Sequence, residues 1–177
     1  MKTISRFLSP AQITGIILLS AAVLSFFISS FLAIAIALFY VVLCIAASFF
    51  PQSGFYLPVI SRGLTGKNLV ALTFDDGPSE PITRQILDLL DRYAAKATFF
   101  VSGVNAVKHP DIIREIIARG HSVGNHSFHH NPLLMLGSYH YLYQEIFRAQ
   151  EVLQKMGGNT QAFRPPVGIV NPRLPQM

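Results

Sequence analysis

An apolar block near the N-terminus constrains the fold of this chain more than any other feature. Residues 13–50 contain no Asp, Glu, Lys, Arg or His. This block is nearly twice as long as the ~20 residues that one membrane-spanning helix needs. A cleaved signal peptide has an apolar core of only ~7–15 residues, so it fits the block poorly. The block therefore predicts a membrane segment.

Three serines near the middle of the block indicate where it turns. They are Ser25, Ser29 and Ser30. Two spans joined by a tight turn fit this pattern best, at roughly residues 11–28 and 31–50. A single long, tilted span is the alternative.

Basic residues flank the block on both sides, and they bear on its orientation. Those before it are Lys2 and Arg6, and those after it are Arg62 and Lys67. Because cytoplasmic flanks are enriched in Lys and Arg, a hairpin would leave both ends in the cytoplasm. A single span would place the remainder of the chain outside. The number of spans therefore decides which side of the membrane the remainder occupies.

The net charge of +5 raises the question of nucleic-acid binding. The sequence contains no long Lys/Arg stripe and no interleaving of basic and aromatic residues, so we expect no nucleic-acid partner. The single cysteine, Cys44, lies within the apolar block. It cannot form an intramolecular disulfide, and we interpret it as a buried membrane thiol.

Residues 51–67 are interrupted by Pro and Gly, which predicts a linker. Beyond it, short β-prone runs alternate with helical periodicity, which is typical of successive βα units and a parallel sheet. We expect four strands and three helices in this part of the chain. The strands are expected at 69–74, 97–101, 121–125 and 161–164, and the helices at 82–93, 111–119 and 138–156.

Polar clusters follow three of the four expected strands. Asp75 and Asp76 follow the first strand, His126 follows the third, and Arg164 follows the fourth. In a parallel α/β sheet or barrel the carboxyl ends of the strands share one rim, where functional groups gather. Individually, these clusters could be a turn, a solvated loop and a rigid loop exit. Their order along the chain favours a shared site.

The residue types in these clusters predict metal-assisted hydrolysis. Zinc and similar divalent metals accept imidazole nitrogen and carboxylate oxygen, and a catalytic site keeps one position open for water. His126, His130 and one aspartate would supply three ligands. The other aspartate could then take a proton from the bound water as general base.

Three segments resemble the first three motifs of the NodB-like polysaccharide deacetylases, carbohydrate esterase family 4. They are residues 73–77 (TFDDG), 120–130 (GHSVGNHSFHH) and 163–168 (FRPPVG). The resemblance covers the chain from about Asn68 to the C-terminus. It implies an α/β fold that is a partial (β/α) barrel, roughly its first four strands, preceded here by one or two transmembrane helices.

The resemblance also implies roles for individual residues. Asp75 matches the catalytic base of the family, and Arg164 matches the arginine that orients this base. Asp76, His126 and His130 match the metal ligands, and the metal is usually zinc or another divalent transition ion. No cofactor other than this metal is implied.

In this family the reaction is hydrolysis of an N-acyl group, usually acetyl, from an amino sugar. The main-chain N–H of the residue after the second proline of the motif, here Val167, commonly helps to hold the oxyanion. His121 and His129 match no ligand, so we expect loop or structural roles for them.

The chain departs from the family in its length. The later strands of the family carry two more motifs, including a histidine that acts as general acid, and this chain stops at Met177. About 110 residues follow the linker, whereas a (β/α)₈ framework typically has ~250. We therefore expect a truncated form or a fragment of a longer gene product, with impaired activity and with its first and last strands uncovered.

Together these features predict a membrane segment at 1–50, a linker at 51–67 and a partial deacetylase domain at 68–177. The expected function is a metal-dependent carbohydrate N-deacetylase that acts on C–N bonds other than peptide bonds, in a bacterial inner membrane. Its expected partners are an N-acetylated carbohydrate and the lipid bilayer. The alternatives are a non-catalytic membrane protein with a metal- or carbohydrate-binding remnant, and a small membrane protein with an unfolded tail. The sequence leaves the identity of the glycan open.

Overall fold

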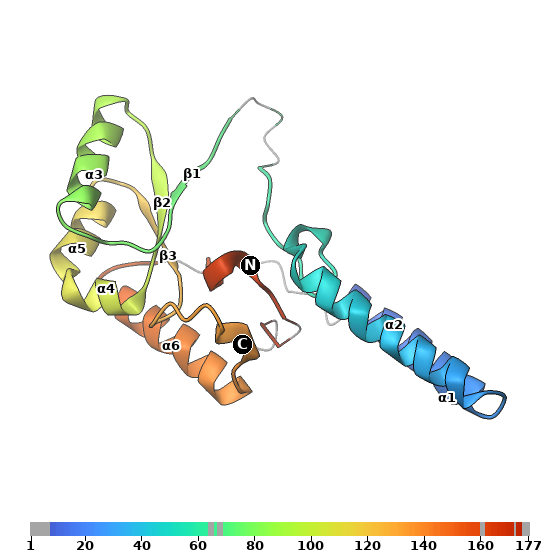
Figure 1. Cartoon of the computed structure of the whole chain (residues 1–177). Helices are drawn as coiled ribbons and strands as arrows, with labels where there is room; N and C mark the ends of the chain where they lie inside the picture. The colour runs from blue at the N-terminus through green and yellow to red at the C-terminus, as the bar shows by residue number, and fades with distance from the viewer. Residues whose placement is uncertain (1–7, 64–65, 67–68, 160–161, 172, 175–177) are drawn as a thin grey trace. The chain divides into compact units, whose positions relative to one another are not determined.

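A computed structural model describes residues 8–63, 66, 69–159, 162–171 and 173–174 (Figure 1). These residues pack into two compact units, one formed by 8–63 with 168–174 and the other by 66–167. The flanking basic residues Lys2, Arg6 and Lys67 lie outside the described residues. The domain boundaries at 50 and 67 stay a prediction.

Two apolar helices form most of the first unit: α1 (Pro10–Phe26) and α2 (Ser30–Ser48). They pack side by side (Figure 1). Ser29, one of the serines that indicate the turn, caps α2 by accepting a hydrogen bond from the N–H of Leu32. The helices therefore lie where the two-span interpretation expects them.

One close approach fixes the packing of the two helices. The Tyr40 hydroxyl donates a hydrogen bond of 3.0 Å to the carbonyl oxygen of Ala11. A Cβ atom at Gly15 would lie 2.5 Å from the same hydroxyl oxygen, so a larger residue there would displace the Tyr40 ring. A short turn of 3₁₀ helix, η1 (Pro51–Ser53), follows α2. Tyr56 and Val170 then complete a small core against Ala11.

Most large side chains of α1 and α2 point away from the rest of their unit. Ala33 is the one buried residue of α2, while its Phe, Ile, Leu and Val side chains are largely exposed. By length and composition alone, α2 is the one helix among the described residues that could cross a membrane, and α1 is a shorter apolar helix. Neither property by itself distinguishes a membrane span from a signal sequence.

The second unit is an α/β structure, as the sequence predicts. Three parallel strands lie in the order β1-β2-β3: β1 (Leu72–Phe74), β2 (Ala97–Val101) and β3 (Ser122–Asn125). Helices connect them and cover one face. They are α3 (Ile82–Arg92), α4 (Gly103–Lys108), α5 (Pro110–Ala118) and α6 (Tyr139–Lys155), with 3₁₀ turns η2 (Leu134–Leu136) and η3 (Pro166–Gly168).

The hydrophobic core lies between this sheet and the helices. Alternation along β2 turns Phe99 and Val101 toward the helices, where they meet Leu87 of α3 and Ile113 of α5. Phe100 points to the opposite face of the sheet, where its ring contacts the guanidinium group of Arg164. One face of the sheet therefore builds the core, and the other carries polar side chains.

The structure differs from the sequence predictions in three main places. The first strand is shorter than expected, and Leu69 and Val70, which were expected to begin it, are 68% and 88% exposed. The reason is that β1 is an edge strand, which agrees with the expectation of an uncovered first strand. Helix α4 was not predicted. The fourth strand is reduced to one parallel bridge between Asn125 and Phe163, and Gln161, its expected start, lies outside the described residues.

Candidate functional site

The structure brings together all five residues that the sequence predicts for the site. Asp75 and Asp76 follow β1, and His126 follows β3. Arg164 follows the bridge at Phe163, where its N–H donates to the carbonyl oxygen of Asn125 at 2.9 Å. The carboxyl ends of adjacent parallel strands therefore supply the cluster, as in other α/β proteins.

Asp76, His126 and His130 form a compact set of potential metal ligands. Their donor atoms all lie within 4.8 Å of one another. Oδ1 of Asp76 is 3.3 Å from Nε2 of His126 and 2.9 Å from Nε2 of His130. Ligand atoms around a tetrahedral zinc ion are about 3.3 Å apart, given metal–ligand distances near 2.0 Å. The spacing and the mixed nitrogen and oxygen donors therefore fit a divalent transition metal.

The orientation of His126 also suits a metal ligand. His126 is 3% exposed, and its Nδ1 donates a hydrogen bond of 2.7 Å to the carbonyl oxygen of Arg164. This contact fixes the tautomer and turns the lone pair of Nε2 toward Asp76. Metal-binding histidines are typically held in this way by a second hydrogen bond on the far side of the ring.

Asp75 lies beside this set and contacts Arg164. Its Oδ1 is 2.6 Å from a guanidinium nitrogen of Arg164, which also donates to Thr73 Oγ1 at 3.1 Å. The guanidinium carbon lies 4.0 Å from the ring centroid of Phe100. A Cβ atom at Gly124 would come within 2.4 Å of that ring, so the glycine makes room for it. Arg164 is therefore held by Thr73 and Phe100 at the position where it contacts Asp75.

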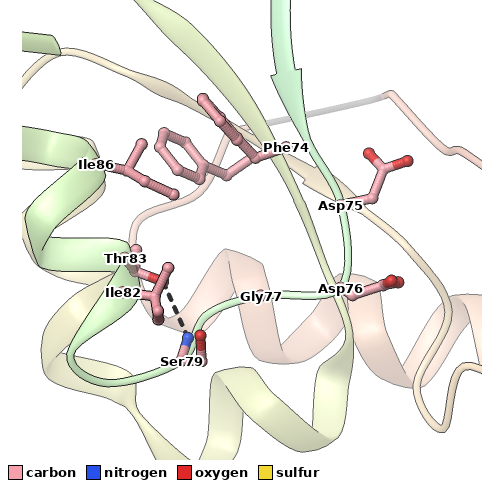
Figure 2. A pocket seen from close by; sticks show the side chains of 9 residues that line it. Phe74, Asp75, Asp76, Gly77, Ser79, Ile82, Thr83 and Ile86 are labelled. Carbon is pink, nitrogen blue, oxygen red and sulfur yellow. Dashed lines mark hydrogen bonds between the residues drawn. The ribbon is translucent and has the colours of Figure 1, made fainter. Parts of the chain in front are cut away.

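A pocket of about 210 Å³ opens between β1 and α3, and both aspartates are among its lining residues. Phe74, Ile82 and Ile86 form its apolar wall, and the Ser79 N–H donates to Thr83 Oγ1 at 2.9 Å at its base. The carboxylates of Asp75 and Asp76 point away from this wall, to the other side of β1 (Figure 2). The two carboxylates therefore face the open side of β1 and not the apolar wall of this pocket.

Unusual backbone conformations concentrate at the site. Five non-glycine residues have positive φ in the described part of the chain, and four belong to the site segments: Asp76, Ser127, His130 and Val167. For a β-branched residue such as Val167 (φ 53°) this conformation is rare. Strained backbone of this kind is retained where surrounding contacts enforce it, which is frequent at active sites.

The two other histidines of the second motif have structural contacts, as expected. His121 is buried, and its Nδ1 accepts a hydrogen bond from the N–H of Ala97 at 3.3 Å. Burial lowers the pKa of His121, and the nearby charges of Lys96 and Arg119 lower it further. His129 contacts Glu145 of α6.

Three residues near the site were not found from the sequence: Phe100, Asn125 and Glu145. Glu145 did leave a signal, because it lies on the helical face that also carries Leu142 and Ala149, where a charge is unexpected. Phe100 and Asn125 gave no comparable signal, since their contacts with Arg164 and Ile146 join distant parts of the chain.

The sequence profile of the family described as "Polysaccharide deacetylase" matches residues 62–177, more than half of the chain. The chain belongs to the polysaccharide deacetylase family. One curated relative is the peptidoglycan-N-acetylglucosamine deacetylase PgdA of Listeria monocytogenes. It is 39% identical over 119 residues, which are 67% of this chain and 25% of PgdA.

Solved structures give the same result. Peptidoglycan deacetylase PdaC from Bacillus subtilis matches with a TM-score of 0.60 and 38% identity, over 63% of this chain and 55% of PdaC. A family 4 acetyl xylan esterase from Clostridium thermocellum, solved with a cobalt ion, matches with a TM-score of 0.55 and 39% identity. That match covers 59% of this chain and 51% of the esterase. The chain therefore spans about a quarter of PgdA and about half of each solved chain.

Proposed function

We propose that this protein is a membrane-anchored, metal-dependent hydrolase that removes N-acetyl groups from an amino-sugar glycan. One observation carries the proposal: a three-ligand set and an arginine-oriented carboxylate lie side by side at one end of the sheet. Family membership supports the reaction class. The relatives whose names specify peptidoglycan support an amino-sugar substrate.

The residues that would hold the metal are Asp76, His126 and His130. Their donor set suits zinc or another divalent transition ion. The cobalt ion in the related esterase structure is in keeping with this choice. When bound, such a metal lowers the pKa of its water ligand and polarises the carbonyl under attack. Asp76 is 68% exposed on its side chain, so the set is open to water and substrate.

Asp75 would act as the general base. Its carboxylate stands beside the ligand set and is not required as a ligand, so it is available to take a proton from the attacking water. The contact of 2.6 Å with Arg164 fixes the direction in which this carboxylate points. The main-chain N–H of Val167, in the segment after Arg164, is the proposed donor to the oxyanion.

The helices α1 and α2 would form the anchor. A helix that exposes apolar side chains on nearly all sides is unstable in water and stable in a bilayer. The capped turn at Ser29 and the close packing at Gly15 support a hairpin with two spans. On this proposal both ends of the hairpin lie on the same side of the membrane.

The test uses the full chain in detergent, loaded with zinc or cobalt. Acetate release is measured from an N-acetylglucosamine oligomer and, in parallel, from an O-acetylated xylan oligomer. We expect release from the amide substrate and a loss of about 10²–10⁴-fold in Asp75→Asn, the usual value of a general base. Asp88→Asn, which alters a carboxylate paired with Arg119 on the helical layer, is the matched control.

Three outcomes would count against the proposal. Release that is equal in Asp75→Asn and the parent protein would remove Asp75 from the base role. Metal binding without release from either substrate would favour a metal-binding remnant without catalysis. Release from xylan alone would move the activity from amide to ester hydrolysis.

A further inference from the structure

Glu145 is a buried carboxylate that the chemistry described above does not use. It lies on the inward face of α6 and is 4% exposed, whereas its neighbours on that face, Leu142, Ala149 and Leu153, are apolar. Burying a carboxylate is costly unless hydrogen bonds compensate for the lost water. The contacts of Glu145 therefore indicate why it is there.

Both oxygens of Glu145 contact His129, the residue directly before the ligand His130. Oε2 accepts the main-chain N–H of His129 at 2.9 Å, and Oε1 is 2.6 Å from Nδ1 of its ring. One carboxylate thus holds the backbone and the side chain of the same residue.

The segment that Glu145 holds is strained. Ser127 and His130 have φ values of 65° and 55°, in the left-handed region that non-glycine residues avoid. Such backbone persists only where its surroundings enforce it. The two ligands His126 and His130 lie at the ends of this segment, so its conformation determines the distance between them.

Other contacts also hold the segment. The N–H groups of Gly103 and Val104, at the start of α4, donate to the carbonyl oxygens of Ser127 and Phe128 at 2.9 and 3.0 Å. Arg148 of α6 lies 3.8 Å over the ring centroid of Phe128. Near His130, the main-chain N–H of His130 itself donates to Ser127 Oγ at 3.2 Å, and α6 adds the carboxylate of Glu145, which holds the main chain of His129.

We propose that Glu145 is a positioning residue for the metal ligand His130. It acts through His129, and it keeps the imidazole of His130 at the distance from Asp76 that metal binding needs. This inference rests on the metal site proposed above. Its distinguishing requirement is geometric: the carboxyl group must reach two atoms of His129, and its negative charge is of secondary importance.

The test measures zinc affinity by calorimetry on the full chain in detergent. We expect Glu145→Ala to weaken zinc binding about 10–100-fold, as is typical when a group that orients a ligand is lost. The absorption spectrum of bound cobalt should change as well, since it reports the ligand geometry directly. Glu151→Ala, which removes an exposed carboxylate from the same helix, should leave both unchanged.

Two conservative variants separate positioning from charge and from folding. Glu145→Gln keeps the reach and loses the charge, so we expect its zinc affinity to stay within about threefold of the parent. Glu145→Asp keeps the charge but is one methylene shorter, so we expect it to bind zinc more weakly than Glu145→Gln. If Glu145→Ala does not fold, the comparison of Glu145→Asp with Glu145→Gln decides. Zinc binding by Glu145→Asp that is as tight as, or tighter than, zinc binding by Glu145→Gln would overturn the inference.

Asp76→Ala separates failure of this inference from failure of the proposed function. If the parent protein and Asp76→Ala both fail to bind zinc, the metal site itself is wrong. If the parent binds zinc, Asp76→Ala does not, and Glu145→Ala equals the parent, then the site stands and the role of Glu145 is refuted.

Discussion

Helices α2 and α6 are similar in length, yet they distribute their side chains in opposite ways. Of 19 residues in α2, one alanine is buried and the large apolar side chains face outward. Of 17 residues in α6, the apolar Leu142, Ala149 and Leu153 face inward, and many polar residues face solvent. The same helical geometry therefore presents an apolar surface in α2 and a largely polar surface in α6. Changes in the two regions should consequently affect different properties.

The largest expected effect falls on the α/β unit alone. Asp76→Ala removes the single carboxylate of the three-ligand set, so we expect zinc affinity to fall on the order of 10³-fold or more. Partition into lipid vesicles should not change, because the substitution leaves α1 and α2 untouched. Calorimetry and vesicle flotation measure the two properties on the same preparation. If Asp76→Ala lost both zinc affinity and association with vesicles, the two regions would not act independently.

The converse change is a charge in the middle of α2. Leu38 is exposed and lies near the centre of the helix, so Leu38→Lys would place an ammonium group deep in the bilayer. Translocon-based scales put this cost at about 2.5–3.5 kcal/mol, or roughly 10²-fold in insertion. We expect weaker vesicle association and an unchanged zinc affinity. Leu38→Ala is the control, and equal association of Lys and Ala variants would argue against a membrane anchor.

A smaller effect should come from the ring beneath Arg164. Phe100→Leu removes the cation–π contact that helps to hold this guanidinium group, so Asp75 should lose part of its orientation. At about 0.5–2 kcal/mol for such contacts, we expect acetate release to fall about 3–30-fold. Zinc affinity should remain as in the parent protein. Phe147→Leu, at an exposed position on α6, provides the comparison, and an equal decrease in both variants would contradict the prediction.

The smallest expected effect is on the pH dependence of folding stability, and it comes from His121, directly before β3. Burial lowers the pKa of folded His121 below its usual value near 6.5. Between these two pKa values, His121 binds a proton in the unfolded chain but not in the folded chain. Stability should therefore decline as the pH falls below about 6.5 and level off below the folded pKa. Lys96 and Arg119 strengthen this effect, and Asp91 opposes it.

The variant His121→Gln can still accept the hydrogen bond from Ala97 but does not titrate. Urea unfolding of the metal-free chain across pH 5–8 should show a shallower decline for this variant than for the parent. Identical pH profiles would show that His121 makes no contribution.

Local pattern accounts for the parts of the structure that the sequence could predict. The run 97–101 becomes a strand with the same bounds, and the helix near 138–156 differs by one residue at each end, because periodicity and the cap at Ser138 are local properties. The exposure of Leu69 and Val70 depends on what lies beside β1, which no local pattern contains.

The same distinction applies to the site. Spaced motifs predicted Asp75, Asp76, His126, His130 and Arg164, and the structure brings them together, while their roles stay predictions. The contacts that hold these residues were not predicted. Phe100 under Arg164 and Glu145 beside His129 join segments 16 or more positions apart, and pairing of that kind is determined by tertiary packing.

Arg164 makes two of the contacts described above with different parts of itself. Its guanidinium group holds Asp75, and its main-chain carbonyl accepts the hydrogen bond from His126. The proposed proton transfer and the proposed metal ligation would consequently be coupled through a single loop position, so a shift of that loop would disturb both together. Substitution of the side chain separates them, because the carbonyl remains in every variant. We therefore expect an Arg164→Ala protein to keep the hydrogen bond that positions His126, while Asp75 loses the side chain that holds its carboxylate. Metal binding and proton transfer could then be measured separately.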